Sequence, residues 1–135
     1  MIDKLDASLR FHQEALNLRA RRQEVLSANI AHADTPNYKA RDINFNAALT
    51  QAVERGRQSQ SVAMATTATG HLAASAGAAN DANLLYRTPV QTSMDGNTVE
   101  MDVERVNFAD NAMRYEMNLT VISAKIKGML AAMQQ

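Results

Sequence analysis

The feature that most constrains this chain is a run of apolar residues near its C-terminal end. The residues recur at alternating spacings of four and three, and they are Phe108, Ala112, Tyr115, Leu119, Ile122, Ile126, Met129 and Met133. A strict repeat of 3.5 residues over about 26 residues predicts a long helix that supercoils against another helix. A turn at Asp95-Gly96 and a capping box formed by Asn97 and Glu100 predict where this helix starts. We therefore expect a helical region over residues 99–135.

The N-terminal segment supplies a partner for that helix. It contains no glycine or proline before Pro36, and the residues of one face again alternate at spacings of three and four, namely Ile2, Leu5, Leu9, His12, Leu16, Arg19, Gln23, Leu26 and Ile30. Polar residues interrupt this seam in its middle, where we interpret His12 as a tolerated seam residue rather than a metal ligand. Pro36 disfavours helical geometry at Thr35. We therefore expect a helix over residues 1–33 that pairs with the C-terminal helix.

The region between these helices, residues 34–98, begins with a second and shorter helix. Asp42 or Asn44 can cap the N-terminus of this helix, and Gly56 can end it. Further along, the run Leu-Leu-Tyr at residues 84–86 predicts a short extended segment.

Residues 59–83 differ from the rest of the chain, because they consist mostly of Ala, Ser, Thr and Gly. Such a composition buries too little surface to offset the entropy of ordering, so this stretch is predicted to be mobile or ordered only by contact with another molecule. The expected fold class is mainly α. Its two long terminal helices pair as a coiled coil and form one core domain, and its middle region is loop-rich or weakly β.

The composition of the chain excludes several functions. Lys plus Arg and Asp plus Glu number 14 each, so no net charge directs the chain to nucleic acid or to an anionic membrane. With no cysteine and three scattered histidines, the sequence shows no recognisable metal or thiol chemistry. It also shows no phosphate-binding loop and no nucleophile motif. We therefore expect no cofactor, no metal, no small-molecule substrate and no enzymatic activity. The acidic N-terminus lacks the pattern of a cleaved secretion signal.

The apolar surface of the C-terminal helix exceeds what one partner can cover. Burial of a large apolar side chain contributes about 1.5–3 kcal/mol, so this helix carries on the order of 20 kcal/mol of potential burial. One seam with polar interruptions cannot cover so wide a face, which predicts assembly with other chains. The predicted subunit-interface residues are Leu5, Leu9, Leu16, Leu26 and Ile30 in the N-terminal helix, and Phe108, Tyr115, Leu119, Ile122, Ile126, Met129 and Met133 in the C-terminal helix.

A local motif follows the first helix, where residues 27–39 are Ser-Ala-Asn-Ile-Ala-His-Ala-Asp-Thr-Pro-Asn-Tyr-Lys. This motif resembles the signature of flagellar rod, hook and hook-associated proteins, in which the first helix runs into an A-N-I-A-N-x-x-T-P-G-Y-K loop. The chain differs at His32, where the family usually has Asn, and at Asn37, where it usually has Gly. Because Asn tolerates a positive φ better than other non-glycine residues, we expect the turn to be kept. The matching motif residues are Asn29, Thr35, Pro36, Asn37, Tyr38 and Lys39.

Residues 39–45, 94–104 and 107–115 are similar to the short, proximal-rod members of this family. The resemblance implies a structural subunit of the proximal rod of the bacterial flagellar basal body, in a helical drive shaft that transmits torque from the membrane ring. The implied location is the periplasmic rod, reached without a cleaved signal peptide. The implied partners are other copies of the chain, other rod proteins, a rod-to-ring adaptor with the membrane-embedded ring, and the flagellar type III export apparatus. A soluble coiled-coil adaptor or a type III secretion chaperone is the alternative, because it could show the same terminal seams.

Overall fold

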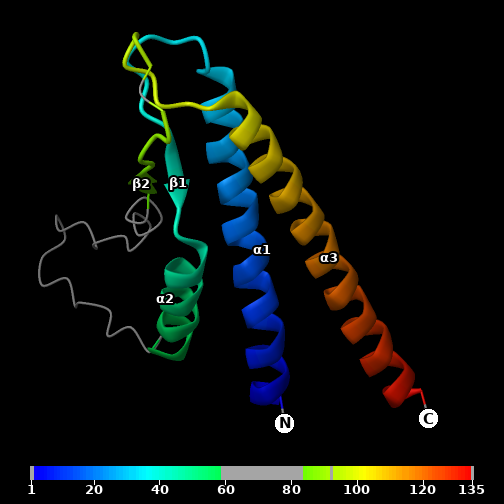
Figure 1. Ribbon diagram of the computed structural model, residues 1–135. Coiled ribbons are helices and arrows are strands. Elements are labelled where there is room, and N and C mark those ends of the chain that lie inside the picture. The colour runs from blue at the N-terminus through cyan, green and yellow to red at the C-terminus, as the bar shows by residue number, and fades with distance from the viewer. Residues whose placement is uncertain (1, 59–83, 92, 135) are drawn as a thin grey trace, which may run out of the picture.

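The computed structural model describes residues 2–58, 84–91 and 93–134. In chain order, its elements are the helix α1 (Ile2–Ala31), the strand β1 (Arg41–Ile43), the helix α2 (Phe45–Gln58), the strand β2 (Leu84–Tyr86) and the helix α3 (Met101–Met133) (Figure 1). This arrangement confirms the mainly helical fold with long terminal helices. The prediction for residues 59–83 lies outside the described residues. None of the helices in the described ranges meets the length and hydropathy that a membrane span requires.

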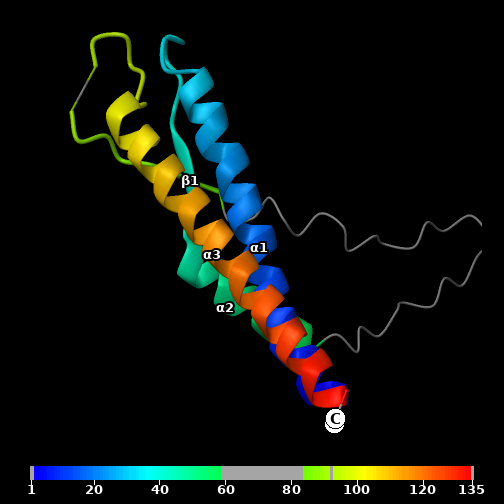
Figure 2. The same cartoon turned by 90° about the vertical axis from the view of Figure 1, so that its right-hand side faces the viewer.

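The two long helices run side by side in opposite directions, so both chain ends lie at the same end of the molecule (Figure 1, Figure 2). α1 is the central element, because α3 packs along it and both α2 and β1 pack against it as well. The predicted pairing of the terminal helices is therefore confirmed.

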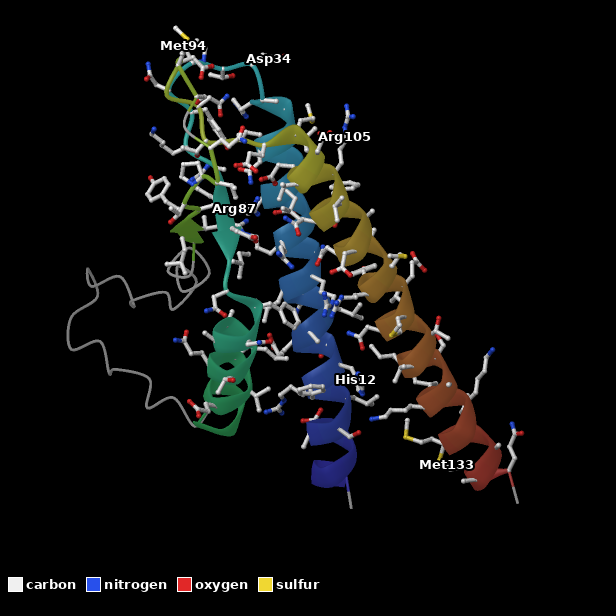
Figure 3. All side chains as sticks on the ribbon, in the orientation of Figure 1. His12, Asp34, Arg87, Met94, Arg105 and Met133 are labelled. Carbon is white, nitrogen blue, oxygen red and sulfur yellow. The ribbon has the colours of Figure 1, made fainter. Side chains whose placement is uncertain are left out.

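A short two-stranded ribbon carries the middle region along α1. β1 and β2 are antiparallel, with Arg41 opposite Tyr86 and Ile43 opposite Leu84. This ribbon confirms the predicted extended segment at residues 84–86. Arg87 follows β2 and donates its backbone N–H to the carbonyl of Ala40 at 2.9 Å. Its side chain lies beside β1, on the side that faces α1 (Figure 3).

The buried core of the described residues is small and partly polar. Its apolar members are Ala15, Leu26, Ala40, Ile43 and Ala48, and its polar members are Asn29, Asn97, Glu104 and Asn111. A buried polar group costs free energy unless it is hydrogen-bonded. The partners of these four side chains therefore decide how the fold is held together.

The start of α3 differs from the prediction. The helix begins at Met101, and Glu100 occupies the N-cap position without a side-chain capping hydrogen bond. The capping box predicted at Asn97 and Glu100 is therefore wrong. The carboxylate of Glu100 instead accepts hydrogen bonds from the backbone N–H groups of Val90 at 2.8 Å and Gln91 at 3.3 Å. The side chain of Asn97 bonds the turn that follows α1, as described below.

The bounds of α2 agree with the prediction at one end only. Asn44 accepts a hydrogen bond at its Oδ1 from the backbone N–H of Ala47 at 3.2 Å, so the predicted N-terminal cap is confirmed. The helix does not end at Gly56 but continues to Gln58. A glycine inside a helix costs only about 1 kcal/mol relative to alanine, so it does not by itself end one.

Candidate functional site

At one end of the molecule, the segment that follows α1 lies against the segment that precedes α3. Residues 32–40 follow α1 and residues 93–99 precede α3, and we call these two segments together the joint. Asn37 has a φ of 60°, as the resemblance to the loop motif predicted. Its backbone N–H donates to the carbonyl of Asp95 at 2.9 Å. The joint lies at the end of the molecule opposite the chain termini, where Figure 3 labels Met94.

A glycine allows the two segments of the joint to approach closely. Gly96 has a φ of 71°, and a Cβ atom at this position would lie only 2.7 Å from Oδ1 of Asn37. Lys39 donates from Nζ to the carbonyl of Gly96 at 2.6 Å. Thr98 donates its backbone N–H to the carbonyl of Tyr38 at 3.0 Å. The pairing of the segments therefore combines backbone bonds, the side chain of Lys39 and the absence of a side chain at position 96.

The buried side chain of Asn97 bonds the turn that follows α1. Its Nδ2 lies within hydrogen-bond distance of three carbonyl oxygens, those of His32 (3.0 Å), Ala33 (2.7 Å) and Thr35 (3.0 Å). Its Oδ1 accepts from the backbone N–H of Val99 at 2.8 Å. These carbonyls belong to the turn after Ala31, so a residue that precedes α3 holds the chain where it leaves α1.

Tyr38 holds the joint against α1. Its ring stacks on that of His32, with the centroids 4.5 Å apart and the planes 6° from parallel. Its hydroxyl donates to Oδ1 of Asn29 at 3.4 Å. Asn29 is fully buried and bonds both backbone groups of Arg41, donating to the carbonyl at 2.7 Å and accepting from the N–H at 3.2 Å. Asn29 thus links α1 to the joint and to β1 at once.

A cluster of charged side chains ties four elements together next to the joint. Asp42 accepts hydrogen bonds from Arg22 at 2.9 and 3.0 Å and from Arg87 at 2.7 Å. Arg87 also forms an ion pair with Glu104, whose side chain is completely buried. Glu104 accepts a further hydrogen bond from Asn29 at 3.3 Å. These residues come from α1, β1, the end of β2 and α3, and we call them the charge cluster.

The two arginines set the ionisation of Asp42. Burial alone would raise the pKa of its carboxyl, but hydrogen bonds from Arg22 and Arg87 outweigh burial and leave the pKa below its ordinary value. The hydrogen bond to Asp42 in turn raises the pKa of Arg22. Asp42 is therefore charged at neutral pH. Over the part of the chain that the structure describes, no group of three His, Cys, Asp or Glu side chains could hold a metal ion.

Polar side chains also line the contact between α1 and α3. On α3 they recur every seven residues, and we call them the polar ladder: Glu104, Asn111, Asn118 and Lys125. Asn111 donates to the carbonyl of Arg19 at 2.9 Å and to Oε1 of Gln23 at 2.6 Å. Asn118 accepts from the ring Nδ1 of His12 at 2.8 Å and donates to the carbonyl of the same residue at 3.2 Å. His12 is therefore a hydrogen-bonding member of the helix contact.

Comparisons with known proteins connect this geometry to a family. Residues 9–39, which include most of α1 and the start of the joint, match the family described as flagella basal body rod protein. The chain is 55% identical over 136 residues to flagellar basal body rod protein FlgB of Yersinia enterocolitica, which covers 100% of this chain and 99% of the relative. It is 57% identical to FlgB of Escherichia coli K12 and 54% identical to FlgB of Salmonella typhimurium LT2, each over 135 residues. Both alignments cover 99% of this chain and 98% of the relative. The chain belongs to the FlgB family.

Membership of the FlgB family confirms the resemblance found in the loop motif. The FlgB relatives are named as rod proteins of the flagellar basal body. The chain is accordingly a structural rod subunit of the flagellar basal body, and its family implies assembly with other rod components.

The predicted interface residues of this FlgB-family chain fall into two groups on α3. Phe108, Tyr115, Ile122 and Met129 are half-buried and share the face of the polar ladder, whereas Leu119, Ile126 and Met133 are exposed. On α1, Leu26 is fully buried, and Leu9, Leu16 and Ile30 are half-buried. Leu5 lies outside the residues whose side chains are described. The contacts of these residues with other subunits stay a prediction.

The motif residues of the FlgB-family chain also divide by position. Asn29 and Tyr38 face the interior of the joint, whereas Thr35, Pro36, Asn37 and Lys39 are exposed on its outside. The exposed four are therefore accessible to a neighbouring molecule. Their part in such a contact remains a prediction.

α3 exposes several large apolar side chains along its length. They are Val103, Val106, Met113, Met117, Leu119, Val121, Ile126, Leu130 and Met133. Val106, Met113 and Met117 are the most outward before the C-terminal turns, with exposed fractions of 68%, 65% and 67%. A groove of about 780 Å³ runs between α1 and α3, and its lining includes Phe108, Tyr115 and, at its edge, Met113.

Sequence reasoning missed the charge cluster and the polar ladder. Asp42 and Arg87 are 45 residues apart, and no local pattern pairs them. The polar ladder could have been found in the sequence, because its four polar residues recur every seven residues, which is the period of the apolar seam.

Proposed function

We propose that this chain is a subunit of the proximal rod, and that its terminal helices assemble it into the helical drive shaft that transmits torque from the membrane ring. Membership of the FlgB family supports the rod. The observation that carries assembly through the helices is the exposure of Val106, Met113 and Met117 on the side of α3 away from α1.

The physical argument starts from the faces of α3. Large apolar side chains that a helix exposes to water are stabilised when another element covers them. Among the described residues the packing partner of α3 is α1, so the outer apolar side chains lack cover from the described part of their own subunit. Their burial would contribute about 1.5–3 kcal/mol for each side chain. Contacts between unlike surfaces of successive copies do not close a ring and extend into an open helix, which is the geometry of a rod.

The joint and the charge cluster support the transmission of torque. Asn97 links the end of α1 to the start of α3, and Asn29 and Glu104 link the two helices directly. Each of these buried side chains has more than one hydrogen-bond partner, so relative rotation of the two helices would break several bonds together. A twisting force applied to one long helix would therefore pass to the other.

The neighbours we propose are other copies of the chain, other rod proteins, and a rod-to-ring adaptor with the membrane-embedded ring. We further propose that the flagellar type III apparatus exports the chain without a cleaved signal, and that the terminal helices pair fully on assembly. The small core supports this order of events, because Leu26 and Ile43 are its large apolar members among the described residues. The stability of a chain with so little apolar burial depends on its neighbours.

The experiment uses a bacterial strain from which the chain's own gene is deleted, complemented with full-length variants. Met113→Glu with Met117→Glu places two charges on the outer face of α3, and we expect loss of swimming and basal bodies without a rod in electron micrographs. The matched control is Asn46→Glu with Thr50→Glu, at exposed positions of α2, which we expect to swim normally. Normal rods in the methionine variant would refute assembly through this face.

The alternative function, a soluble coiled-coil adaptor or secretion chaperone, predicts a different behaviour of the purified chain. Circular dichroism and sedimentation would then show a stable, fully helical monomer or a closed dimer. The rod subunit is instead expected to gain helix only as it assembles into open-ended particles. A closed, stable dimer would favour the adaptor.

A further inference from the structure

Apolar contact alone does not determine which face of α3 turns toward α1. Phe108, Tyr115 and Ile122 lie on the side toward α1. Val106 and Met117 expose further apolar surface on the opposite side. A helix with apolar residues on opposite faces can rotate about its own axis and still bury a similar area. A second feature must therefore select the observed rotation.

The polar ladder distinguishes the two faces. Each member has a partner on α1: Glu104 bonds Asn29 at 3.3 Å, Asn111 bonds Arg19 and Gln23, Asn118 bonds His12, and Lys125 donates from Nζ to Oγ of Ser8 at 3.0 Å. The ladder spans three heptads, so its hydrogen bonds act along most of the contact between the helices. At 3.6 residues per turn, Met113 lies about 200° around the helix from Asn111. A rotation that brought Met113 to α1 would therefore turn the ladder away from all of its partners.

We propose that the polar ladder determines the rotation of α3 about its own axis, so that Val106, Met113 and Met117 always face outward. A polar residue in a helix seam lowers stability but selects one arrangement over its competitors. Asn111 and Glu104 are fully buried, and in any other rotation the groups that they pair on α1 would lose their partners. The use of the outward face in a rod rests on the proposed function, whereas the rotation itself does not.

Thiol accessibility measures this rotation directly. The chain contains no cysteine, so a single Met113→Cys reports the outward face and a single Ile122→Cys reports the ladder face. Ile122 lies four residues after Asn118 and therefore shares its face. Both reporters are placed in the full-length chain, in an osmolyte concentration at which circular dichroism shows the helices formed. With the ladder intact, we expect the thiol at position 113 to be alkylated about tenfold faster than the thiol at position 122.

The decisive variant removes three ladder members together with two of their side-chain partners on α1. Its substitutions are His12→Ala, Gln23→Ala, Asn111→Ala, Asn118→Ala and Lys125→Ala. Leucine is avoided because it would complete an apolar heptad seam and hold the same rotation by itself. Glu104 is kept because it pairs with Arg87. We expect the ratio of alkylation rates to fall to about one, with position 122 more reactive and position 113 less reactive than before. An unchanged ratio would overturn the proposal. Protection of both thiols would overturn it as well, because it would mean association without rotation.

Two control variants separate the loss of the ladder from the gain of alanine. Thr120→Ala with Ser123→Ala places alanine at exposed positions of α3 and is expected to keep the tenfold ratio. His12→Asn with Asn118→His exchanges one polar pair across the contact and is also expected to keep it. Collapse of the ratio in the first control would assign the effect to alanine itself. Collapse in the second would show that a polar pair at these positions does not hold the rotation.

Discussion

The substitution Asn97→Asp tests the joint most sharply, because it changes the chemistry of one side-chain atom and leaves the shape almost unchanged. In the structure, Nδ2 of Asn97 lies 2.7–3.0 Å from the carbonyl oxygens of His32, Ala33 and Thr35. A carboxylate would place a negatively charged oxygen against these three oxygens. The other oxygen could still accept from the N–H of Val99, as Oδ1 does now at 2.8 Å.

The magnitude follows from the hydrogen bonds that are lost. The amide carries two hydrogens, so the substitution removes two donated hydrogen bonds, each with a net contribution of about 1 kcal/mol. The buried charge next to three carbonyl dipoles adds a cost of at least about 1 kcal/mol more. We therefore expect the free energy of unfolding to fall by about 3 kcal/mol, which is a factor of about 100 in the folding equilibrium.

Osmolyte-driven folding, followed by far-ultraviolet circular dichroism, measures this change in the purified chain. The matched control is Asn17→Asp, which makes the same chemical change at an exposed position of α1 and is expected to shift stability by no more than about 0.5 kcal/mol. The carbonyls around position 97 would raise the pKa of the introduced carboxyl in the folded chain above its unfolded value of about 3.9. The defect is therefore largest above that raised pKa and shrinks as the pH falls through it, because a protonated carboxyl can donate again. Equal folding midpoints for Asn97→Asp and Asn17→Asp at neutral pH would refute the role of Asn97.

Three further predictions concern the joint and the charge cluster. Gly96→Ala should lower the free energy of unfolding of the osmolyte-folded chain by more than about 1 kcal/mol, because φ at this position is 71° and the new Cβ would meet Asn37. Adding Asn37→Gly should recover the stability lost to the steric contact, but not the stability lost to the backbone conformation. Tyr38→Ala should reduce swimming, whereas Tyr38→Phe should keep most of it, because the hydrogen bond from the hydroxyl to Asn29 is long at 3.4 Å. Full rod assembly and motility in Tyr38→Ala would count against the role of Tyr38 in holding the joint against α1. The pKa of Asp42 is lowered in the folded chain. The stabilisation that Asp42 provides should therefore be complete above the unfolded pKa of about 3.9 and be lost as the pH falls through the lower folded pKa. The folding midpoint of Asp42→Asn should depend less on pH over that range.

Local periodicity explains why the long helices could be predicted from the sequence. Uninterrupted apolar spacing and the absence of glycine and proline are properties of neighbouring residues, and they located α1 and α3 within a few positions. The rotation of α3 was predicted only in part. Phe108, Tyr115, Ile122 and Met129 do face α1, but the intervening seam positions belong to the polar ladder, whose members find partners 75 to 117 residues away. Periodicity ranks residues by hydrophobicity and does not reveal such pairs.

The joint shows the same division between local and distant information. The turn at Asn37 could be predicted because its backbone requirement is local. The role of Asn97 could not, because the preference of Asn for capping a following helix is a rule about adjacent residues. In the fold, the side chain of Asn97 reaches carbonyls 62 to 65 residues earlier in the chain.

The arrangement of polar and apolar groups in this subunit is the reverse of that in an ordinary soluble domain. Its inner contacts depend on directional hydrogen bonds of Asn29, Asn97 and Asn111, which fix geometry but contribute only about 1 kcal/mol each. Its outer face carries Met113 and Met117, whose flexible side chains adapt to surfaces that are not identical. Under the proposed function, this division has a physical reason. A rod subunit needs one internal geometry in every copy, and it gains most of its stability from neighbours that differ along the rod.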